Sequence, residues 1–431
     1  MSDAPEIVTL DTDAQLREAI AAHARVHGDP EPVWEEFHVR HPHWAAPGAT
    51  RAVIEDGRIV ALTSLATIDL RFGDTTLPAG EIGLVGTLPE HRNRGHSRRL
   101  MESWLATLRE RHVPVSYLVG IPGYYERWDY HYAAPDQVNH FLAITHDPLT
   151  RCAEPIGTGR DAEEHDIPAI QALLDAELRG TPCSAVLDDA LLRYFLDRAE
   201  AHGVAWRVVE IDGHIGAVVR HKKWGEGIGP QAPGAVTLVA ARPEARPAVA
   251  AMLLEHLADG KQAELPLAIA PHAPFAGWLH LRGALRKCDR SIFPGGYAAM
   301  VRINDLAAVL EAVMHRWDTD RLAERHAGAS VTLRVGREDD QVATIDVLGN
   351  GIGLRHGAGG VEIGAPPAVT VPWVTGWRSA ADWLDATPFP PLPGPAADPG
   401  DPATLPEEVQ DLLRDLFPVR HPWIGDTIQG A

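Results

Sequence analysis

The chain has 431 residues, which at roughly 150 residues per domain predicts about three domains. Hydrophobic residues make up 45% and charged residues 23%, values that are typical of a globular protein and exclude a disordered or collagen-like chain. The formal net charge of −20 disfavours nucleic acid and anionic membranes as partners and favours small cationic molecules, although a local basic patch could still bind an anion.

The cysteines and the N-terminus bear on the cellular compartment. Cys152, Cys183 and Cys288 are far apart and odd in number, so they fit neither a disulfide framework nor a cysteine-based zinc motif. The first residues are acidic without the apolar segment of a secretory signal, and no run of about 18 apolar residues predicts a membrane span. We therefore expect a cytoplasmic protein with reduced thiols and no membrane partner.

Residues 7–145 alternate helix and strand patterns, which predicts an α/β unit with a mixed sheet. Helices are expected at 16–27 and 95–111, strands at 51–55, 59–70, 82–87, 113–121 and 138–144, and one helical turn at 124–128. Asp56-Gly57 is typical of the tight turn of a hairpin between the first two strands.

After a polar segment at 146–160, expected to be a linker, the order of elements partly recurs. Helices are predicted at 167–178, 247–257 and 274–281, and strands at 204–211, 215–220, 235–240, 265–269 and 298–303. This is a weak internal similarity to the first unit.

A third pattern begins near residue 306. Helices are predicted at 306–317, 319–325 and 407–417, a short helical region at 373–384, and antiparallel strands at 331–335, 341–348, 351–356 and 361–363. The proline-rich stretch 388–406 can form neither a helix nor a central strand, and we expect a semi-rigid tether there.

The strongest chemical pattern is a buried strand, Ile82–Thr87, that runs through a basic turn into an amphipathic helix. The turn reads Arg92-x-x-Gly95-x-Ser97, with further arginines at 94 and 98. Free backbone N–H groups at a helix start bind anions, and a glycine lets the backbone approach a phosphate. The pattern predicts a pyrophosphate site, with a plain strand–helix junction carrying solvated arginines as the alternative. Its spacing is neither the Walker A nor the dinucleotide glycine pattern.

The turn resembles the acetyl-CoA motif of the GNAT N-acetyltransferase superfamily, Arg/Gln-x-x-Gly-x-Gly/Ala, with Ser97 at the last small position. The segment from Tyr125 to Tyr130 resembles the Tyr-x-Arg-Phe-Gly-Tyr segment of the enhanced-intracellular-survival (Eis-like) acetyltransferases, with Trp128 in place of Phe and Asp129 in place of Gly. The resemblance implies an α/β (α+β) chain of two tandem GNAT-like mixed-sheet domains, 1–146 and 147–303, and a sterol-carrier-protein-like α+β domain, 304–431.

The resemblance also implies the roles of individual residues. Acetyl-CoA would be the co-substrate, with no metal, and a small amine the acceptor in a cytoplasmic homo-oligomer. The cofactor would be held by Val85, Gly86, Thr87, Arg92, Asn93, Arg94, Gly95, His96 and Ser97. The phenol of Tyr125 would be the general acid, and the carboxylate of Ala431 is a candidate base.

Other side chains are candidates for the acceptor site. Trp34 and Phe37 could line an acceptor pocket, with a small hydrophobic cluster as the alternative, and Glu81 is an alternative base. The run His38-x-x-His41-x-His43 has no cysteine or carboxylate cluster at ligand spacing, so we expect no metal there but a turn near a pocket rim.

Three functions remain open from the sequence. The first is transfer of an acetyl group to an amine of a small, cationic acceptor by direct attack in a ternary complex. The second is a non-catalytic acyl-CoA-binding sensor or scaffold. The third is a GNAT enzyme of specialised metabolism with another acyl donor or acceptor. In the second unit the corresponding loop, 241–247, has no glycine and two prolines, which predicts a non-catalytic copy.

Overall fold

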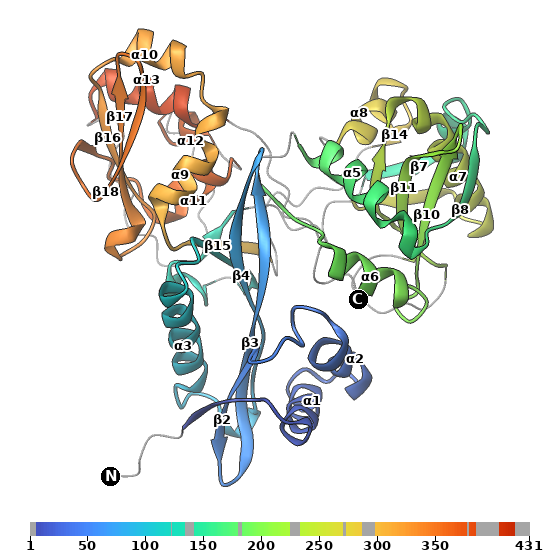
Figure 1. Ribbon diagram of the computed structural model, residues 1–431, viewed down its shortest axis with the longest axis horizontal. Helices are drawn as coiled ribbons and strands as arrows, with labels where there is room; N and C mark the ends of the chain where they lie inside the picture. Colours follow the sequence, from blue (N-terminus) through green and yellow to red (C-terminus); the bar gives the residue numbers. More distant parts are fainter. Residues whose placement is uncertain are drawn as a thin grey trace. The chain divides into compact units, whose positions relative to one another are not determined.

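The computed structural model describes residues 6–121, 123–133, 142–179, 183–224, 233–269, 273–286, 298–376, 379–384 and 405–418. The chain separates into two compact units, residues 1–134 with 299–420, and residues 135–298 with 421–431 (Figure 1). No helix in these described ranges is long and apolar enough to cross a bilayer.

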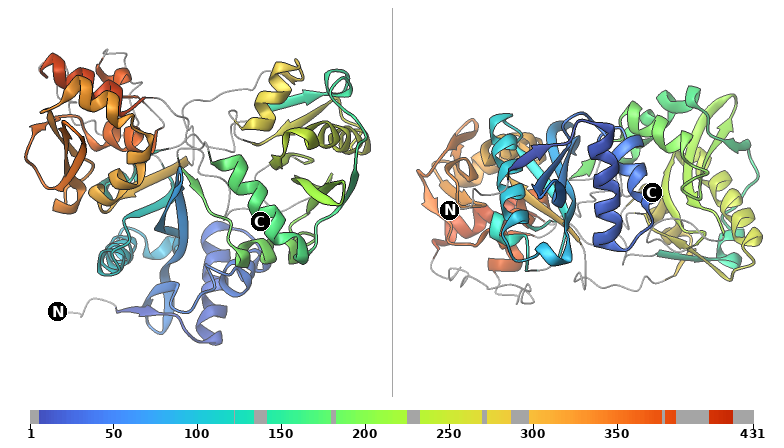
Figure 2. Two further views of the ribbon diagram at one scale, coloured as in Figure 1. Left: turned by 45° about the horizontal axis from the view of Figure 1, so that its top comes forward. Right: turned by 90° about the horizontal axis from the view of Figure 1, so that it is seen from below.

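The main sheet of the first unit has the strand order β1-β2-β3-β4-β5-β15-β6. Its strands are β1 (Ile7–Thr9), β2 (Thr50–Glu55), β3 (Arg58–Phe72), β4 (Thr75–Thr87), β5 (Val115–Gly120), β15 (Ala298–Ile303) and β6 (His131–Tyr132). The first four pair antiparallel and β4 pairs with β5 in parallel, which makes the sheet mixed. Helices α1 (Asp13–His27) and α3 (His96–Glu110) cover opposite faces of it (Figures 1 and 2).

Local chemistry explains the boundaries of these elements. Thr12 caps α1 in a reciprocal pair with Gln15, so the helix begins three residues before the predicted start. Asp56 and Gly57, with φ of 50° and 74°, form the two-residue turn between β2 and β3. The apolar side of α3 buries Leu100 and Trp104 against the sheet. A short α2 (Glu31–Glu35) and a π-helical turn, η1 (Glu36–Arg40), follow α1 and were not predicted.

The second unit is built on a sheet of order β14-β7-β13-β12-β11-β10-β8. The strands are β7 (Leu142–Thr145), β8 (Thr158–Asp161), β10 (Val204–Ile211), β11 (His214–Lys222), β12 (Val236–Ala241), β13 (Glu264–Leu267) and β14 (Leu285–Arg286). Helices α5 (Ile167–Leu178) and α6 (Asp189–Asp197) pack on one face. Helices α4 (His146–Thr150), α7 (Arg246–Asp259) and α8 (Pro274–Leu281) pack on the other. Both cysteines of the described residues, Cys152 and Cys183, are buried, and Cys288 lies outside those residues.

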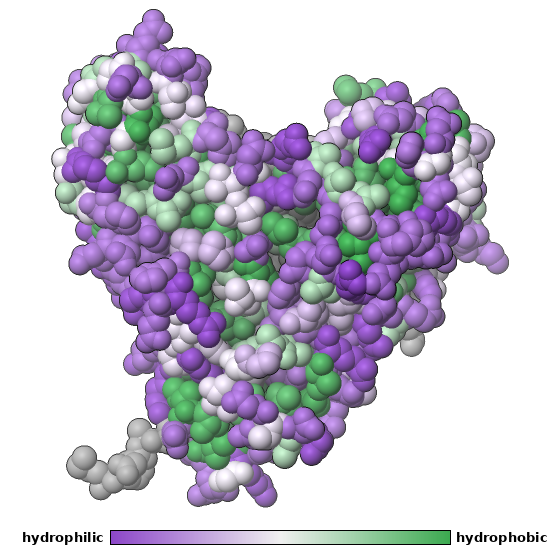
Figure 3. All heavy atoms as spheres, viewed as in Figure 1, coloured by the Kyte–Doolittle hydropathy of each residue, from purple (hydrophilic) through white to green (hydrophobic). Residues whose placement is uncertain are grey.

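A separate four-stranded sheet, β18-β17-β16-β19, completes the first unit. Its strands are β16 (Ser330–Arg334), β17 (Val342–Leu348), β18 (Gly351–His356) and β19 (Val361–Glu362), and its helices are α9 (Leu306–Val313), α10 (Thr319–His326), α11 (Pro367–Thr375), α12 (Ala380–Leu384) and α13 (Glu407–Leu416). The tether predicted at 388–406 falls almost wholly outside the described residues. Hydrophilic residues predominate on the molecular face of Figure 3, in keeping with the charge of the chain.

The mixed α/β class agrees with the sequence analysis, but three strands and the linker differ. Strand β7, predicted in the first unit, pairs with β13, whereas β15, predicted to close the second unit, pairs with β6 in the first. Strand β19 pairs in parallel with β16 instead of antiparallel. The polar segment expected to be a linker contains α4 and β8. Short strands of this kind carry an apolar pattern but no information about which sheet edge they will join.

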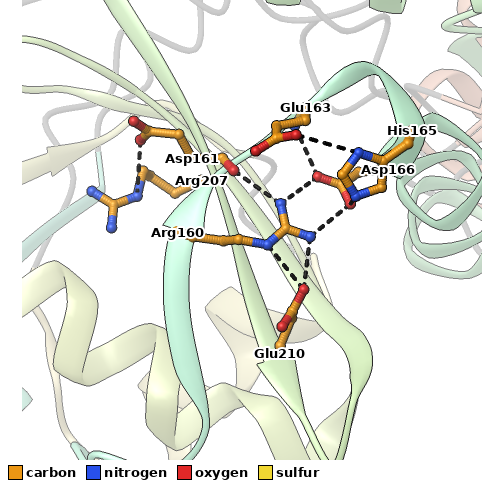
Figure 4. Close-up of polar contacts among 7 residues, drawn as sticks. All are labelled: Arg160, Asp161, Glu163, His165, Asp166, Arg207 and Glu210. Carbon is orange, nitrogen blue, oxygen red and sulfur yellow. Dashed lines mark hydrogen bonds and ion pairs between the residues drawn. The ribbon is translucent and has the colours of Figure 1, made fainter.

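An ion-pair network fastens the edge strand β8 to the start of α5 (Figure 4). The guanidinium of Arg160 donates to both oxygens of Asp166, at 2.6 and 2.8 Å, and to Glu210 on β10, at 2.7 Å. The Asp166 side chain is only 1% exposed, and its hydrogen bonds with Arg160 hold the pKa of its carboxyl below the ordinary value. Arg160 therefore joins two strands of the sheet, β8 and β10, to the start of helix α5.

We predict that Asp166→Asn lowers the stability of this sheet by about 2–3 kcal/mol at pH 7, because a partly buried guanidinium then loses its bidentate charged partner and keeps only Glu210. Since the folded-state pKa is depressed, the stabilisation is present above the unfolded-state pKa and is lost as the pH falls through the folded-state pKa. The difference from wild type should therefore shrink in acid.

Hydrogen exchange at the amides of β8, β10 and α5 in increasing urea measures this sheet alone. The control is Asp161→Asn, because that side chain is 83% exposed in its pair with Arg207. A loss in Asp161→Asn as large as that in Asp166→Asn would show that the network does not act through Asp166.

Candidate active site

A cavity of about 680 Å³ opens in the first unit where the basic turn meets the tyrosine segment. Its lining consists of Val26, His27, Val85, Thr87, His91, Arg92, Asn93, Arg94, Gly95, His96, Ser97, Arg98, Ile121, Tyr124, Tyr125, Arg127 and Trp128. The fold thus places in one cavity two motifs that are 30 residues apart in the sequence.

One wall of the cavity exists because β4 and β5 diverge. The two strands pair in parallel only from Ala79 with Val115 to Glu81 with Tyr117. From Ile82 onward, β4 pairs only with β3 among the strands that the structure describes. Backbone groups of β4 beyond this point are therefore available to a ligand that lies along the strand, as an extra strand would.

The backbone of β4 is irregular at the same place. Leu84 has a φ of 49°, a left-handed conformation that costs a residue with a Cβ about 1–2 kcal/mol. Leu84 and Val85 together stand opposite Thr63 of β3, since the register moves from Leu62–Gly86 to Ser64–Gly83. This is a β-bulge, and it turns the backbone at Val85, which lines the cavity.

The basic turn forms an anion site at the start of α3. The first intrahelical bond is from Arg99 N to Gly95 O, so the N–H groups of His96, Ser97 and Arg98 have no acceptor within the helix. Gly95 has a φ of 82° and Asn93 a φ of 63°, which fold the turn tightly around these groups.

Arginine side chains add positive charge around these N–H groups. Arg92, Arg94, Arg98 and Arg127 all line the cavity, in a chain whose net charge is −20. The Nε of Arg92 donates to the carbonyl of Thr87 at 3.3 Å, which ties this guanidinium to the end of β4. The charge and the helix start together suit a pyrophosphate.

The carboxylate of Glu55 contacts three side chains in and beside the basic turn. The oxygens of Glu55, at the end of β2, lie 2.8 Å from His91 Nδ1, 3.2 Å from His96 Nε2 and 3.3 Å from Arg94 Nη1. Burial of the imidazole lowers the pKa of His96, and the nearby carboxylate opposes this effect. Glu55 therefore anchors both ends of the turn, and no sequence motif indicated this role.

The same carboxylate and imidazoles have the spacing of a metal site. Glu55, His91 and His96 each offer one ligand atom, and these atoms lie within 4.8 Å of one another. However, the guanidinium of Arg94 already forms an ion pair with the same carboxylate. The positive end of α3 and the arginines of the lining also repel a cation. The donor set is thus better suited to shaping an anion site than to holding a metal.

Tyr125 lies just before a 3₁₀ turn, η3 (Glu126–Trp128), that presents it to the cavity. Its side chain is 6% exposed and packs edge to face against Tyr124, with ring centroids 4.8 Å apart. Asp129, which stands where the Eis-like segment has glycine, takes a left-handed φ of 60°. Aspartate tolerates this conformation better than most residues, so the chain can make the same turn with Asp129 in place of glycine.

The predicted acceptor residues lie outside this cavity. Trp34 is buried and stacks on the imidazole of His23, at 4.7 Å between ring centroids. Phe37 is half-buried beside Trp34, 6.2 Å away. The buried Glu81 accepts a hydrogen bond of 2.7 Å from the phenol of Tyr117. Gly86 is also outside the lining, and Ala431 lies outside the described residues.

The chain turns at 42–45 as expected, but the histidine run 38–43 does not contribute to the lining of this cavity. His38 lies in the π-helical turn η1 and is 1% exposed, and His41 is fully buried. His27, at the end of α1, does line the cavity. Burial lowers the pKa of its imidazole, and a hydrogen bond to the backbone of Val85 opposes that shift. The sequence carried no signal for His27, because its role depends on how α1 crosses β4.

Comparisons with known proteins agree with this geometry. Residues 8–133 match the family model of the acetyltransferase (GNAT) domain. A search of curated proteins finds no match.

The fold of the whole chain is similar to several solved structures. A probable N-acyltransferase from Enterococcus faecalis shares 15% identity over 98% of this chain and 99% of its own, with a TM-score of 0.69. A GCN5-related N-acetyltransferase from Kribbella flavida shares 16% identity over 98% of this chain and 100% of its own, also at 0.69. Eis1 from Mycobacterium abscessus shares 18% identity over 97% and 99%, with a TM-score of 0.66.

Residues 8–133 are therefore a GNAT acetyltransferase domain, and the whole chain has the fold of these solved structures. The resemblance to the Eis-like proteins that was drawn from the sequence is confirmed in the fold.

We predict that Gly95→Asp abolishes binding of acetyl-CoA and leaves the fold intact. The substituted Cβ would meet no atom within 4 Å, but the left-handed backbone would be strained and the carboxylate would repel a pyrophosphate. Calorimetric titration with acetyl-CoA measures the loss.

The matched control is Gly28→Asp at the end of α1, where φ is +85° and the space is equally open. It imposes the same strain away from the turn, and its affinity for acetyl-CoA should stay at the wild-type value. Unchanged affinity in Gly95→Asp would remove this turn from the cofactor site.

Proposed function

We propose that the chain transfers an acetyl group from acetyl-CoA to an amine of a small, cationic acceptor, by direct attack in a ternary complex. The observation that carries this proposal is the single cavity in which the anion-binding helix start and Tyr125 meet. In the proposal, Arg92–Ser97 hold the pyrophosphate, and the pantetheine arm follows β4 along Val85, Gly86 and Thr87.

The chemistry of the lining favours direct transfer. The amine nitrogen attacks the thioester carbon, the carbon–sulfur bond breaks, and Tyr125 gives its phenolic proton to the departing thiolate. Backbone N–H groups near Val85 and Thr87 polarise the thioester carbonyl. No cysteine stands among the described residues of the lining, and the hydroxyl of Ser97 is paired with that of Thr87 at 2.8 Å. The described lining therefore offers no thiol that could carry the acyl group.

The base and the charge of the acceptor are proposed on grounds other than the cavity. The carboxylate of Ala431 is the proposed base, on the resemblance to the Eis-like proteins alone, and Glu81 is the alternative. The net charge of −20 supports a cationic acceptor, because the field of the protein raises the local concentration of cations.

The remaining assignments are proposals of the same kind. The second unit would be a degenerate GNAT-like domain, since a 3₁₀ turn with Pro243 and a helix beginning at Arg246 stand where the first domain has its glycine turn. Residues 304–431 would form a sterol-carrier-protein-like domain. A cytoplasmic homo-oligomer follows from the resemblance, and the domain boundaries near 146 and 303 remain as proposed.

The test is release of free thiol from acetyl-CoA across a panel of small amines, with neutral alcohols as matched controls. We expect amine-dependent release that is fastest with polyamines or other cationic amines. Binding of acetyl-CoA without release, for every amine, would contradict catalysis and favour a sensor. Mass spectrometry of the co-purified CoA species identifies a different acyl donor.

We predict that Tyr125→Phe lowers kcat by roughly 10²–10⁴-fold, the usual range for a lost general acid, with little change in the affinity for acetyl-CoA. Steady-state thiol release and calorimetry measure the two quantities. Tyr124→Phe is the control, because Tyr124 lines the same cavity and contacts the Tyr125 ring. A full loss in Tyr124→Phe with none in Tyr125→Phe would transfer the role to the neighbour.

A further inference from the structure

A chain of hydrogen bonds between buried side chains ends on the irregular backbone of β4. Its links are His23 Nε2 to Leu84 O at 2.7 Å, His23 Nδ1 to His38 Nε2 at 2.8 Å, His38 Nδ1 to Thr50 Oγ1 at 3.4 Å, and Thr50 Oγ1 to Ser64 Oγ at 2.8 Å. The four side chains come from α1, η1, β2 and β3, and each residue is at most 3% exposed. None of these four side chains lines the cavity, so direct contact with a ligand in the cavity does not account for their hydrogen bonds.

The carbonyl at one end determines the direction of every bond. A carbonyl oxygen only accepts, so Nε2 of His23 carries its hydrogen. Burial lowers the pKa of His23 well below its ordinary value and that of His38 to about 4, so both imidazoles are neutral at pH 7. Nδ1 of His23 must then accept from Nε2–H of His38. Nδ1 of His38 in turn accepts from the hydroxyl of Thr50, and Ser64 donates to Thr50.

The accepting carbonyl belongs to the residue directly before Val85. Leu84 is the left-handed residue of the β-bulge, and its conformation needs an interaction that compensates for the strain. Gly86 leaves the room for this interaction, because a Cβ there would stand 3.2 Å from Cδ2 of His23. The stacked ring of Trp34 supports the plane of the same imidazole.

We propose that His23 is a positioning residue, which holds the Leu84 carbonyl and thereby aims the amide N–H of Val85 at the thioester carbonyl. His38, Thr50 and Ser64 act through it by fixing its tautomer. This inference rests on the proposed function, in which the backbone at Val85 polarises the thioester. It also gives Trp34 a role in supporting His23 in place of contact with the acceptor.

The experiment is a double-mutant cycle on His23 and Leu84. His23→Phe keeps an aromatic ring but cannot donate, and we expect kcat to fall about 10–100-fold, since small misplacements of a reacting geometry have effects of this order. The affinity for acetyl-CoA should change less than about threefold, because the pyrophosphate site is untouched. Adding Leu84→Gly, which adopts φ near 50° without strain, should restore most of kcat.

The rescue separates positioning from packing. If His23 merely filled space, Leu84→Gly would remove further side-chain contacts and deepen the loss. His202→Phe is the control for loss of a buried histidine, because His202 is 1% exposed and belongs to the second unit. It should leave kcat unchanged. An unchanged kcat in His23→Phe, or a double variant no better than the single one, would overturn the inference.

Two readouts need no turnover and so distinguish this inference from the proposed function. Nitrogen-15 NMR of labelled histidines should show His23 neutral at pH 7 with hydrogen on Nε2, and hydrogen exchange at the Val85 amide should be at least about tenfold faster in His23→Phe. If the wild type releases no thiol with any amine, the proposed function fails, and these two results still decide whether His23 holds the strand. A charged or Nδ1-protonated His23, or an unchanged exchange rate, would contradict the inference while thiol release by the wild type could still support the proposed function.

Discussion

The site depends on β4 leaving its neighbour β5 at Glu81 while remaining paired to β3. This divergence exposes backbone groups that a sheet would otherwise satisfy, and the bulge at Leu84 turns them toward the cavity. Exposed strand edges are usually a liability, because they pair with other chains. Here the strand ends in the turn that starts α3, so a ligand lying along β4 also reaches the helix N-terminus. The irregular strand β4 therefore runs from the backbone groups that could contact the thioester to the anion site at the start of α3.

Electrostatics is the second constraint. A chain with net charge −20 disfavours any anionic cofactor at long range, and it binds one only where positive charge is concentrated. The structure places arginines 92, 94 and 98 around the start of α3, and the carboxylate of Glu55 contacts side chains of the same turn. In the proposed function, the overall negative charge would attract a cationic acceptor, while the local patch would hold the anionic co-substrate.

Much of this arrangement could be predicted from the sequence, because the relevant signals are local. The turn Arg92–Ser97 and Tyr125 carry their chemistry in contiguous motifs, and helix α5 and strand β10 follow their apolar periodicity. What could not be predicted depends on contacts between distant segments. The His23–His38 pair and His27 reach β4 only because α1 packs against that strand, and Glu55 reaches the basic turn from the end of β2. Similarly, β7 pairs with β13 in the second unit and β15 pairs with β6 in the first, and no property of their own sequences indicates these partners.

Trp34, a predicted acceptor residue, shows why one sequence pattern can leave two interpretations open. Aromatic side chains near a helix end are typical of both pockets and hydrophobic clusters, and only the stacking partner decides between them. Trp34 stacks on the imidazole of His23, packs at a tilt against that of His27, and is 7% exposed. In the inference drawn for His23, the contribution of Trp34 to the site is indirect, through the imidazole that it supports.

A crystal structure of the chain with acetyl-CoA tests the central claim most directly. The account predicts the pyrophosphate within hydrogen-bond distance of the backbone N–H groups between Arg92 and Arg98. It also predicts the thioester carbonyl at the Val85 N–H and the sulfur within reach of the Tyr125 phenol. A cofactor whose pyrophosphate lies away from the start of α3, or whose thioester lies away from Val85, would contradict it.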